Sequence, residues 1–423
     1  MHEWRRWLYS LIFFMALPVI LLRLYWRGRN AAGYRERWWQ RLGYVPALTG
    51  NPPLWIHAVS VGEAVAIIPL VERLLVERPD MPILITTMTP TGASRVSAHF
   101  GSSVHHIYCP YDLPFALNRF LSRIKPRACM IVETELWPNM IHTCHQKNVP
   151  VMVVNARLSE RSLKGYQKIE CLTAQMLSKL TLLIAQGEAD AKRFAALGMP
   201  SDRVRISGSI KFDFSIDDSL LAQGHAVRTR AGERFTVVLA SSHSDEEQQC
   251  LTMMQSVWQR YPDLLLIIVP RHPERFDSVW DQCLKVDPQA KRRSEGVLPD
   301  KRTRVYLGDS MGELMGLYAA ADLVVMGGSF VDVGGHNPVE PAALGTPVIM
   351  GPYHHNFAAI SAAMAEKGGM LLVNSFEQTA ACINQLIEVP QKRQQLGSIA
   401  KAYADSQRGA LDRVYHEVTP YLF

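Results

Sequence analysis

The sequence predicts an α/β protein with two successive domains that face each other across a cleft. Short apolar runs alternate with amphipathic stretches along most of the chain, which is typical of parallel sheets covered by helices on both faces. The length of 423 residues suits two or three domains. A polar stretch at 212–234 lacks strand-like runs, and we interpret it as the linker between the domains.

Composition, charge and cysteines limit the class of protein. Hydrophobic residues make up 48% of the chain and charged residues 20%, which excludes a disordered or fibrous protein. The net charge of +6 is too weak to predict binding to nucleic acid. The seven cysteines are scattered without a CxxC pair, which argues against disulfides or a thiolate zinc site and for reduced thiols in the cytoplasm.

The N-terminal segment 1–30 is predicted to be a hydrophobic membrane anchor. Residues 7–22 carry no charge, although the run is short for a spanning helix, which needs about 20 apolar residues, and it contains Pro18. Tryptophan and tyrosine flank the run, as at bilayer interfaces, and the Arg-rich stretch 23–41 suits anionic lipid. The alternative is a buried hairpin of helices.

The first α/β domain is predicted to span 31–215. Its helical segments include 64–78 and 113–123. Its buried strands are expected at 54–58, 82–86, 104–108, 128–132, 150–154 and 182–185.

The second domain is predicted to span 216–423, and its strands are followed by candidate helix starts. The strands are expected at 236–240, 264–269, 304–307, 322–326 and 347–350. The helix starts are a capping box at Ser244–Glu247, a proline start at Pro273, a capping box at Ser310–Glu313, and Asn337 as cap before Pro338 and Glu340. Such starts gather at the carboxyl edge of a parallel sheet and predict a seat for a nucleotide phosphate, unless they only terminate helices.

Several cofactor signatures are absent. Neither GxGxxG nor GxxxxGK[ST] occurs, which excludes a dinucleotide oxidoreductase and a P-loop NTPase. None of the fourteen histidines shows metal-ligand spacing with carboxylates on a helix. The sequence therefore predicts no metal and no cofactor.

Candidate acid–base residues follow strands of the first domain. Glu63 comes after strand 54–58 and is placed to take a proton from an acceptor hydroxyl, although Ser60-x-x-Glu63 is also a capping box. Glu133 and Glu135 follow strand 128–132 and are either site carboxylates or helix-start charges. Lys211 precedes the predicted linker, where it reaches into the cleft or is simply solvated.

Nine motifs in order along the chain together resemble the 3-deoxy-D-manno-octulosonic acid (Kdo) transferases of lipopolysaccharide synthesis. They cover nearly the whole sequence. The motifs are HAVSVGE (57–63), TTMTPTG (86–92), PYDLP (110–114), ETELWPN (133–139), NARLSERS (155–162), GSIKFD (208–213), PRHPERF (270–276), GDSMGEL (308–314) and GGHNPVE (334–340).

The resemblance implies a GT-B fold of two Rossmann-like domains and inverting transfer of Kdo from CMP-Kdo to the lipid A precursor, lipid IVA. It also implies attachment to the cytoplasmic side of the inner membrane, in contact with its lipid. Carried over by position, Glu63 would be the base, and Glu133 and Lys211 would support the transition state. The residues that would hold CMP are Arg271, His272, Gly312, Glu313, Leu314, Asn337, Pro338, Val339 and Glu340.

Two other functions remain open at this level. One is a related enzyme that uses a UDP-sugar, either a transferase or an epimerase. The other is a membrane-associated binding protein without catalytic activity. The number of Kdo residues transferred is not predicted by the sequence.

Overall fold

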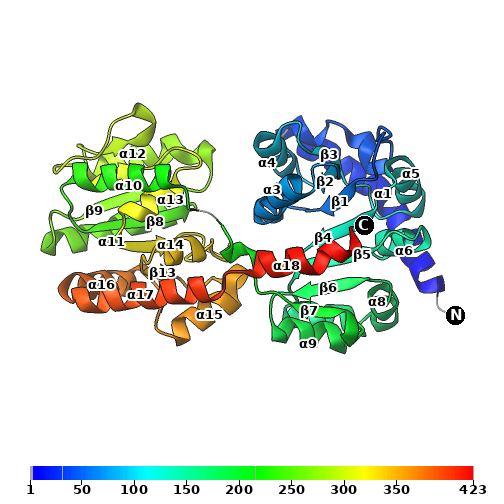
Figure 1. Cartoon of the computed structure of the whole chain (residues 1–423). Coiled ribbons are helices and arrows are strands. Elements are labelled where there is room, and N and C mark those ends of the chain that lie inside the picture. The colour runs from blue at the N-terminus through cyan, green and yellow to red at the C-terminus, as the bar shows by residue number, and fades with distance from the viewer. Residues whose placement is uncertain (1–2, 31, 215, 423) are drawn as a thin grey trace. The chain divides into compact units, whose positions relative to one another are not determined.

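The computed structural model describes residues 3–30, 32–214 and 216–422. The chain forms two compact units: unit 1 is Met1–Phe214 with Arg408–Phe423, and unit 2 is Ser215–Gln407 (Figure 1). The sequence-based assignment of all of 216–423 to the second domain is therefore wrong at its C-terminal end. Helix α18 (Ala410–Val418) buries Val414, Tyr415 and Val418 in the core of unit 1.

Unit 1 is built on a parallel sheet in the order β3-β2-β1-β4-β5-β6-β7. All six predicted strands are present, whereas β7 was not predicted because its residues are partly exposed and form no apolar run. The strands are β1 (Leu54–His57), β2 (Ile83–Thr87), β3 (His105–Tyr108), β4 (Ala128–Val132), β5 (Val151–Ala156), β6 (Leu182–Ala185) and β7 (Val204–Ile206).

Helices cover the unit 1 sheet. The predicted segment 64–78 is two helices, because Pro69 lacks an N–H and begins a new helix rather than continuing the first. The helices after the N-terminal one are α2 (Val61–Ala66), α3 (Ile68–Glu77), α4 (Pro90–Phe100), α5 (Pro114–Ile124), α6 (Pro138–Gln146), α7 (Glu160–Gln167), α8 (Glu170–Leu177) and α9 (Glu188–Ala196).

The apolar N-terminal segment is one helix, α1 (Glu3–Asn30), which continues through Pro18. It is long and apolar enough to cross a membrane by length and composition, with a mean hydropathy of 2.0, and only 6% of its apolar window is buried. This exposure contradicts the alternative of a buried helical hairpin. One edge of α1 nevertheless packs on unit 1, where Phe13 and Leu17 contact a small cluster that includes Tyr111 and Leu113.

Polar contacts also fasten α1 to unit 1. Arg6 Nη1 and Ser10 Oγ each donate a hydrogen bond to Asn139 Oδ1, at 3.0 and 3.1 Å. Asp112 accepts from the backbone N–H groups of Asn139 and Met140, at 3.0 and 2.7 Å. The N-terminal turns of α1 are thus joined to the start of α6 by buried hydrogen bonds.

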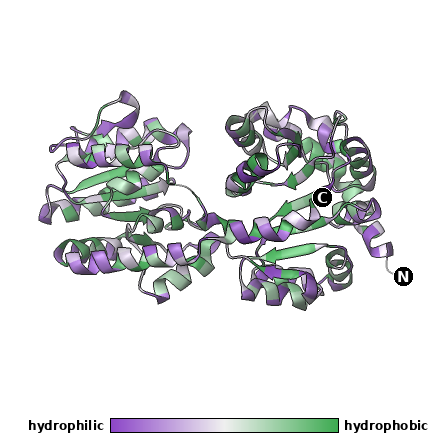
Figure 2. Ribbon diagram, viewed as in Figure 1, coloured by the Kyte–Doolittle hydropathy of each residue, from purple (hydrophilic) through white to green (hydrophobic). Residues whose placement is uncertain are grey.

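Unit 2 has a second parallel sheet, in the order β10-β11-β9-β8-β12-β13-β14. Its strands are apolar and its helices carry polar residues on their outer faces (Figure 2). The five predicted strands are present, and the others are two-residue edge strands. The strands are β8 (Thr236–Ser242), β9 (Leu265–Pro270), β10 (Lys291–Arg292), β11 (Val305–Leu307), β12 (Leu323–Met326), β13 (Val348–Met350) and β14 (Leu371–Leu372).

The predicted linker at 212–234 is wrong, because most of it is helix α10 (Asp218–Ala231) of unit 2. Asp217 caps its start and Gly232, with φ of 89°, ends it. A Cβ on Gly224 would lie 2.2 Å from the carbonyl oxygen of Gly316, so small residues rather than an apolar stripe make the contact with α13 (Leu314–Ala320). The hydrophobic pattern of a packed helix is therefore missing from the sequence.

The remaining helices of unit 2 follow its strands or pack beside them. They are α11 (Glu246–Arg260), α12 (Phe276–Val286), α13 (Leu314–Ala320), α14 (Val339–Ala343), α15 (Ala358–Glu366), α16 (Phe376–Glu388) and α17 (Pro390–Ser406).

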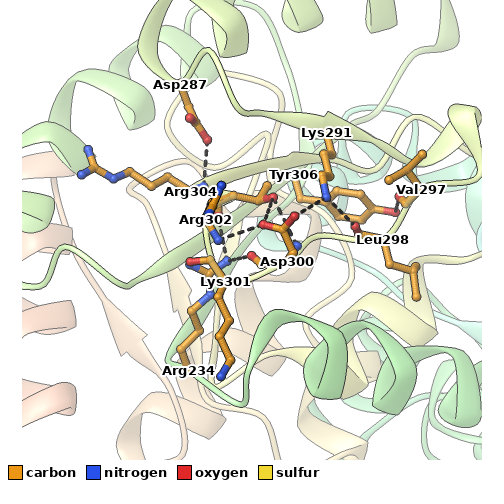
Figure 3. Close-up of polar contacts among 11 residues, drawn as sticks. Arg234, Asp287, Lys291, Val297, Leu298, Asp300, Lys301, Arg302, Arg304 and Tyr306 are labelled. Atoms are coloured by element: carbon orange, nitrogen blue, oxygen red, sulfur yellow. Dashed lines mark hydrogen bonds and ion pairs between the residues drawn. The ribbon is translucent and has the colours of Figure 1, made fainter.

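A polar network holds the loop that enters β11 (Figure 3). Asp300 accepts from Lys291 Nζ at 2.7 Å and from the Arg302 N–H at 2.8 Å, and Arg234 Nη2 donates to the Asp300 carbonyl at 2.7 Å. The hydrogen bonds from Lys291, the larger cause, and from the Arg302 N–H hold the pKa of Asp300 well below its usual range. The network fixes the residues just after Leu298, and Leu298 itself lines a cavity beside α10.

Candidate functional site

Glu63 is held at the carboxyl edge of the unit 1 sheet. Ser60 is the N-cap of α2, so Glu63 lies in the first turn of that helix. Ser60 Oγ donates to Glu63 Oε1 at 2.8 Å, and the Val59 N–H donates to Oε2 at 2.6 Å. The residue is 8% exposed. Ser60 Oγ also accepts the Glu63 N–H at 3.3 Å, so the predicted cap is present beside the two bonds that orient the carboxylate.

The environment of Glu63 suits a general base. Its pKa is raised to about 7, mainly by burial, which outweighs the hydrogen bonds from Ser60 and Val59, and in smaller part by the charges of Glu133 and Glu135. A carboxyl group with this pKa is about half ionised at neutral pH, and its conjugate base is stronger than an ordinary carboxylate. The capping role and the acid–base role are compatible in one side chain.

The structure brings Glu133 and Lys211 into contact within unit 1. Lys211 Nζ lies 2.7 Å from Glu133 Oε1. Glu133 follows β4, the neighbour of β1 in the sheet, and has a φ of 60°, a left-handed conformation that is unfavourable for a glutamate. Strained residues of this kind gather at functional sites. The three residues predicted to be catalytic are thus close together, since the charge of Glu133 acts on Glu63.

Asn155 positions Lys211 and was missed as a site residue by sequence reasoning. It lies at the end of β5, the next strand beyond β4, with a φ of 56° and a fully buried side chain. Its Oδ1 accepts the Ile210 N–H at 3.2 Å, one residue before Lys211. A buried asparagine within an apolar strand was the signal available in the sequence.

In unit 2, loops after three neighbouring strands bring histidines together. His243 follows β8, His272 follows β9, and His336 lies beyond β12. His243 Nε2 and His336 Nε2 are 2.9 Å apart, and the rings of His243 and His272 are 5.2 Å apart. Burial, followed by the charges of His243, Arg271 and His272, lowers the pKa of His336 to about 3. A short contact between two ring nitrogens requires one to donate and the other to accept, so at least one of the two imidazoles is neutral.

Arg271 is the exposed cation of this group. Among the described residues its guanidinium has no carboxylate partner, whereas Arg275 Nη2 binds Glu247 at 2.9 Å and Arg293 Nη2 binds Glu313 at 2.7 Å. The Arg271 N–H donates to the Ser242 carbonyl at 2.9 Å, which fixes its backbone against β8. Of the residues predicted to hold CMP, Arg271 has a charge still available for an anion.

In the glycine-rich loop that follows β12 (327–335), near the predicted phosphate seat, two backbone N–H groups are taken by a carboxylate of the chain. Glu246 accepts the N–H groups of His243 and Gly328, both at 2.8 Å, and of Phe330 at 3.0 Å. Its pKa is raised by burial against these three bonds. The backbone donors of this loop therefore organise the site internally rather than wait for a ligand.

Two predicted capping boxes do not form. At the first, α11 begins after Asp245 without a side-chain cap, and Glu247 instead accepts from Ser242 Oγ at 2.9 Å. At the second, Ser310 and Arg293 both bind Glu313, which precedes α13 rather than lying in its first turn. Glu247 also pairs with Arg275, and neither carboxylate forms a capping box. Gly312, with φ of 86°, and Leu314 flank Glu313 in the same turn.

Asn337 was predicted to cap a helix, and it makes a cap-like contact beside the start of α14, although Pro338 rather than Asn337 stands at the N-cap position. Asn337 Oδ1 accepts the Val339 N–H at 3.1 Å, and its Nδ2 donates to Glu340 Oε1 at 3.1 Å. Pro338 occupies the N-cap position of α14, which has five residues. The pKa of Glu340 is raised by burial.

Among residues 3–30, 32–214 and 216–422, no group of three or more His, Cys, Asp or Glu side chains is placed to hold a metal ion. Unit 2 has a cavity of about 250 Å³ beside Glu313, lined by α10, α13 and the Arg293–Leu298 turn.

Comparisons with known proteins define the class. A family model described as glycosyl transferases group 1 matches residues 245–403. The structure resembles UDP-GlcNAc 2-epimerase from Neisseria meningitidis bound to UDP-GlcNAc, with a TM-score of 0.59 at 15% identity over 87% of this chain and 99% of that one. At that identity the likeness concerns the fold alone. Together with the two parallel sheets, these matches define a glycosyltransferase of GT-B fold.

Sequence relatives narrow this class to one family. A model described as 3-deoxy-D-manno-octulosonic-acid transferase (kdotransferase) matches residues 36–214. The 3-deoxy-D-manno-octulosonic acid transferase of Haemophilus influenzae is 40% identical over 99% of both chains, and that of Bordetella pertussis is 33% identical over 99% of both. The chain belongs to the Kdo transferase family, and it is an enzyme that transfers Kdo.

Proposed function

We propose that this enzyme transfers Kdo from CMP-Kdo to the lipid A precursor, lipid IVA, with inversion, at the cytoplasmic side of the inner membrane. The observation that carries the proposal is the group of Glu63, Glu133 and Lys211, in which Glu63 has a pKa of about 7. Glu63 takes the proton of the acceptor hydroxyl as that oxygen attacks the anomeric carbon of Kdo. The bond to the phosphate breaks on the opposite side, and its electron pair leaves with CMP.

The remaining residues have distinct proposed roles. Arg271 balances the charge that grows on the phosphate, because hydrogen bonds to ionised groups are stronger than neutral ones. His272 and the 312–314 and 337–340 residues shape the rest of the CMP site. Glu133 and Lys211 stabilise the charge that develops near the base, and the Lys211 cation offsets one of two neighbouring carboxylates.

One experiment tests this function directly. Purified enzyme is incubated with CMP-Kdo and lipid IVA, and the products are weighed by mass spectrometry. We expect a mass increase of one or more Kdo residues, and the increase also counts them. Absence of any product contradicts the proposal. Thermal-shift measurements identify the donor: we expect CMP-Kdo to raise the Tm and UDP-sugars to leave it unchanged, whereas a UDP-sugar enzyme would show the reverse.

The pH profile of kcat/KM should report the ionisation of Glu63. Because the base acts when deprotonated, activity should fall tenfold per pH unit as the pH drops below about 7, where the group becomes protonated. The bond from Ser60 lowers this pKa, so Ser60→Ala should move the acidic limb to higher pH. Ser375→Ala is the matched control, because Ser375 is also an N-cap but lies in unit 2. An unshifted limb in Ser60→Ala would remove Glu63 as the titrating base.

Membrane attachment is expected to depend on the exposed side of α1. Leu11, Met15 and Val19 are exposed there and lie on neighbouring turns of the helix. Replacing all three by serine should move the enzyme into the soluble fraction without changing its Tm or its affinity for CMP.

The matched control changes the packed edge instead. Phe13→Ser and Leu17→Ser remove side chains that contact unit 1, so they should lower the Tm by several degrees. If the exposed-side triple variant still pellets with membranes after a high-salt wash, the attachment site is elsewhere.

A further inference from the structure

Unit 1 has a cavity of about 410 Å³ between α1, the segment leading into α6, and α8. Helix α6 packs against both α1 and α8, so the cavity lies beside three joined helices (Figure 1). Its walls are mostly apolar, which is typical of ligand pockets of this size. The apolar side chains are Leu136, Trp137, Pro138, Ile169, Leu172 and Met176.

The cavity has a polar end next to the proposed catalytic group. Thr134 and Glu135 line it and directly follow Glu133, which binds Lys211. Trp137 Nε1 donates to Glu135 Oε2 at 3.1 Å. Burial raises the pKa of Glu135, and the charge of Glu133 adds to this effect. A carboxylate has about four acceptor positions, so Glu135 has acceptor capacity beyond the bond from Trp137.

The other end of the cavity meets exposed apolar surface. Tyr9 contributes the α1 wall, and Ile12, one turn further along the helix, is 61% exposed. On the α8 side Ile169 is 49% exposed. The cavity thus has a wall on α1, whose neighbouring turn exposes an apolar side chain, and it extends to within two residues of Glu133.

We propose that this cavity receives an acyl chain of the acceptor lipid, with Glu135 accepting a hydrogen bond from an amide or hydroxyl group near the start of that chain. The proposal rests on the proposed function, because it assumes an acylated acceptor. A chain that enters along α1 stays in apolar surroundings from the membrane to the site. The polar head of the acceptor then lies near Glu63 and Glu133. The apolar wall of the cavity makes the enzyme prefer acylated acceptors over bare sugars.

The test uses two water-soluble acceptors that need no membrane. One is the fully deacylated disaccharide of the acceptor, and the other is the same disaccharide with a single hexanoyl chain. Because burying each methylene is favourable, wild-type kcat/KM should be about tenfold or more higher for the hexanoyl compound. Binding of both compounds is also measured by calorimetry, independently of turnover.

Ile169 offers variants with little risk to folding, since it is half exposed. Ile169→Trp fills the mouth of the cavity and Ile169→Asp places a charge there. Both should reduce the preference for the hexanoyl compound to about twofold, with unchanged activity on the deacylated one. Val76→Trp and Val76→Asp are matched controls, because Val76 is 79% exposed on α3 and lies outside the cavity.

The outcomes separate this inference from the proposed function. If wild-type enzyme does not prefer the hexanoyl compound in either assay, or if the Ile169 variants keep the preference, the cavity does not hold an acyl chain. If the wild type binds the hexanoyl compound preferentially and the Ile169 variants do not, the inference stands even where no Kdo is transferred. The absence of Kdo transfer in that case would overturn only the proposed activity.

Discussion

Glu63→Gln should lower kcat by on the order of 10²–10⁴-fold while CMP binding stays unchanged. Glutamine keeps the size of the side chain, and its carbonyl oxygen can still accept the Val59 N–H that now binds Glu63 at 2.6 Å. It cannot take a proton at neutral pH. Because proton removal occurs in the transition state, the loss should appear in kcat rather than in donor affinity.

The measurement compares rates at saturating CMP-Kdo with calorimetric titration by CMP. Glu188→Gln serves as the control, since Glu188 is an exposed residue of α9 with only a distant contact to Lys192, at 3.9 Å. It should behave as wild type in both assays. A loss of less than about fivefold in Glu63→Gln would mean that another group takes the proton.

Charged residues near Glu63 also affect its ionisation. Glu133 raises its pKa, and Lys211 is the cation that binds Glu133. The ionisation of the base is therefore set by burial first, then by the hydrogen bonds from Ser60 and Val59, and last by the charges of Glu133 and Glu135. Asn155 belongs to the same arrangement because it fixes the backbone just before Lys211.

The sheets could be predicted from sequence because their strands are buried on both faces. Runs such as 128–132 and 264–269 are apolar throughout, which distinguishes them from the surrounding amphipathic helices. Edge strand β7 could not be found in this way, since its side chains are partly exposed. Helix α10 was missed for a related reason: the close contact at Gly224 needs a small residue, and that leaves no apolar stripe.

The spacing of polar residues along the chain predicted their contacts less well than the apolar runs predicted the strands. Ser60 and Glu63 have the capping spacing and make the contact, whereas Ser310 and Glu313 have the same spacing and do not form a helix start. Glu313 binds Arg293, which lies 20 residues earlier in the chain, as well as Ser310. Likewise Glu246 takes the backbone donors of a loop more than 80 residues away. Such partners depend on the tertiary fold and are not visible locally.

Arg271→Ala should weaken CMP binding by about tenfold or more and should also slow transfer. Arg271 is exposed and, among the described residues, lacks a carboxylate partner, so its charge is available to a phosphate. A charge-assisted hydrogen bond contributes about 1.5–3 kcal/mol, and about 1.4 kcal/mol corresponds to a factor of ten in affinity. Because charge on the phosphate grows as the bond to Kdo breaks, part of the loss should remain at saturating donor.

Two further variants make this test specific. Arg271→Lys keeps the charge but loses the paired geometry of the guanidinium, so its CMP affinity should fall between those of wild type and Arg271→Ala. Arg230→Ala, at an exposed position of α10 in the same unit, controls for removing one positive charge and should leave the affinity unchanged. If Arg271→Ala binds CMP as tightly as Arg230→Ala does, the phosphate is held by other groups. If Glu63→Gln rather than Arg271→Ala loses CMP, the assignment of the nucleotide to unit 2 and of the base to unit 1 is reversed.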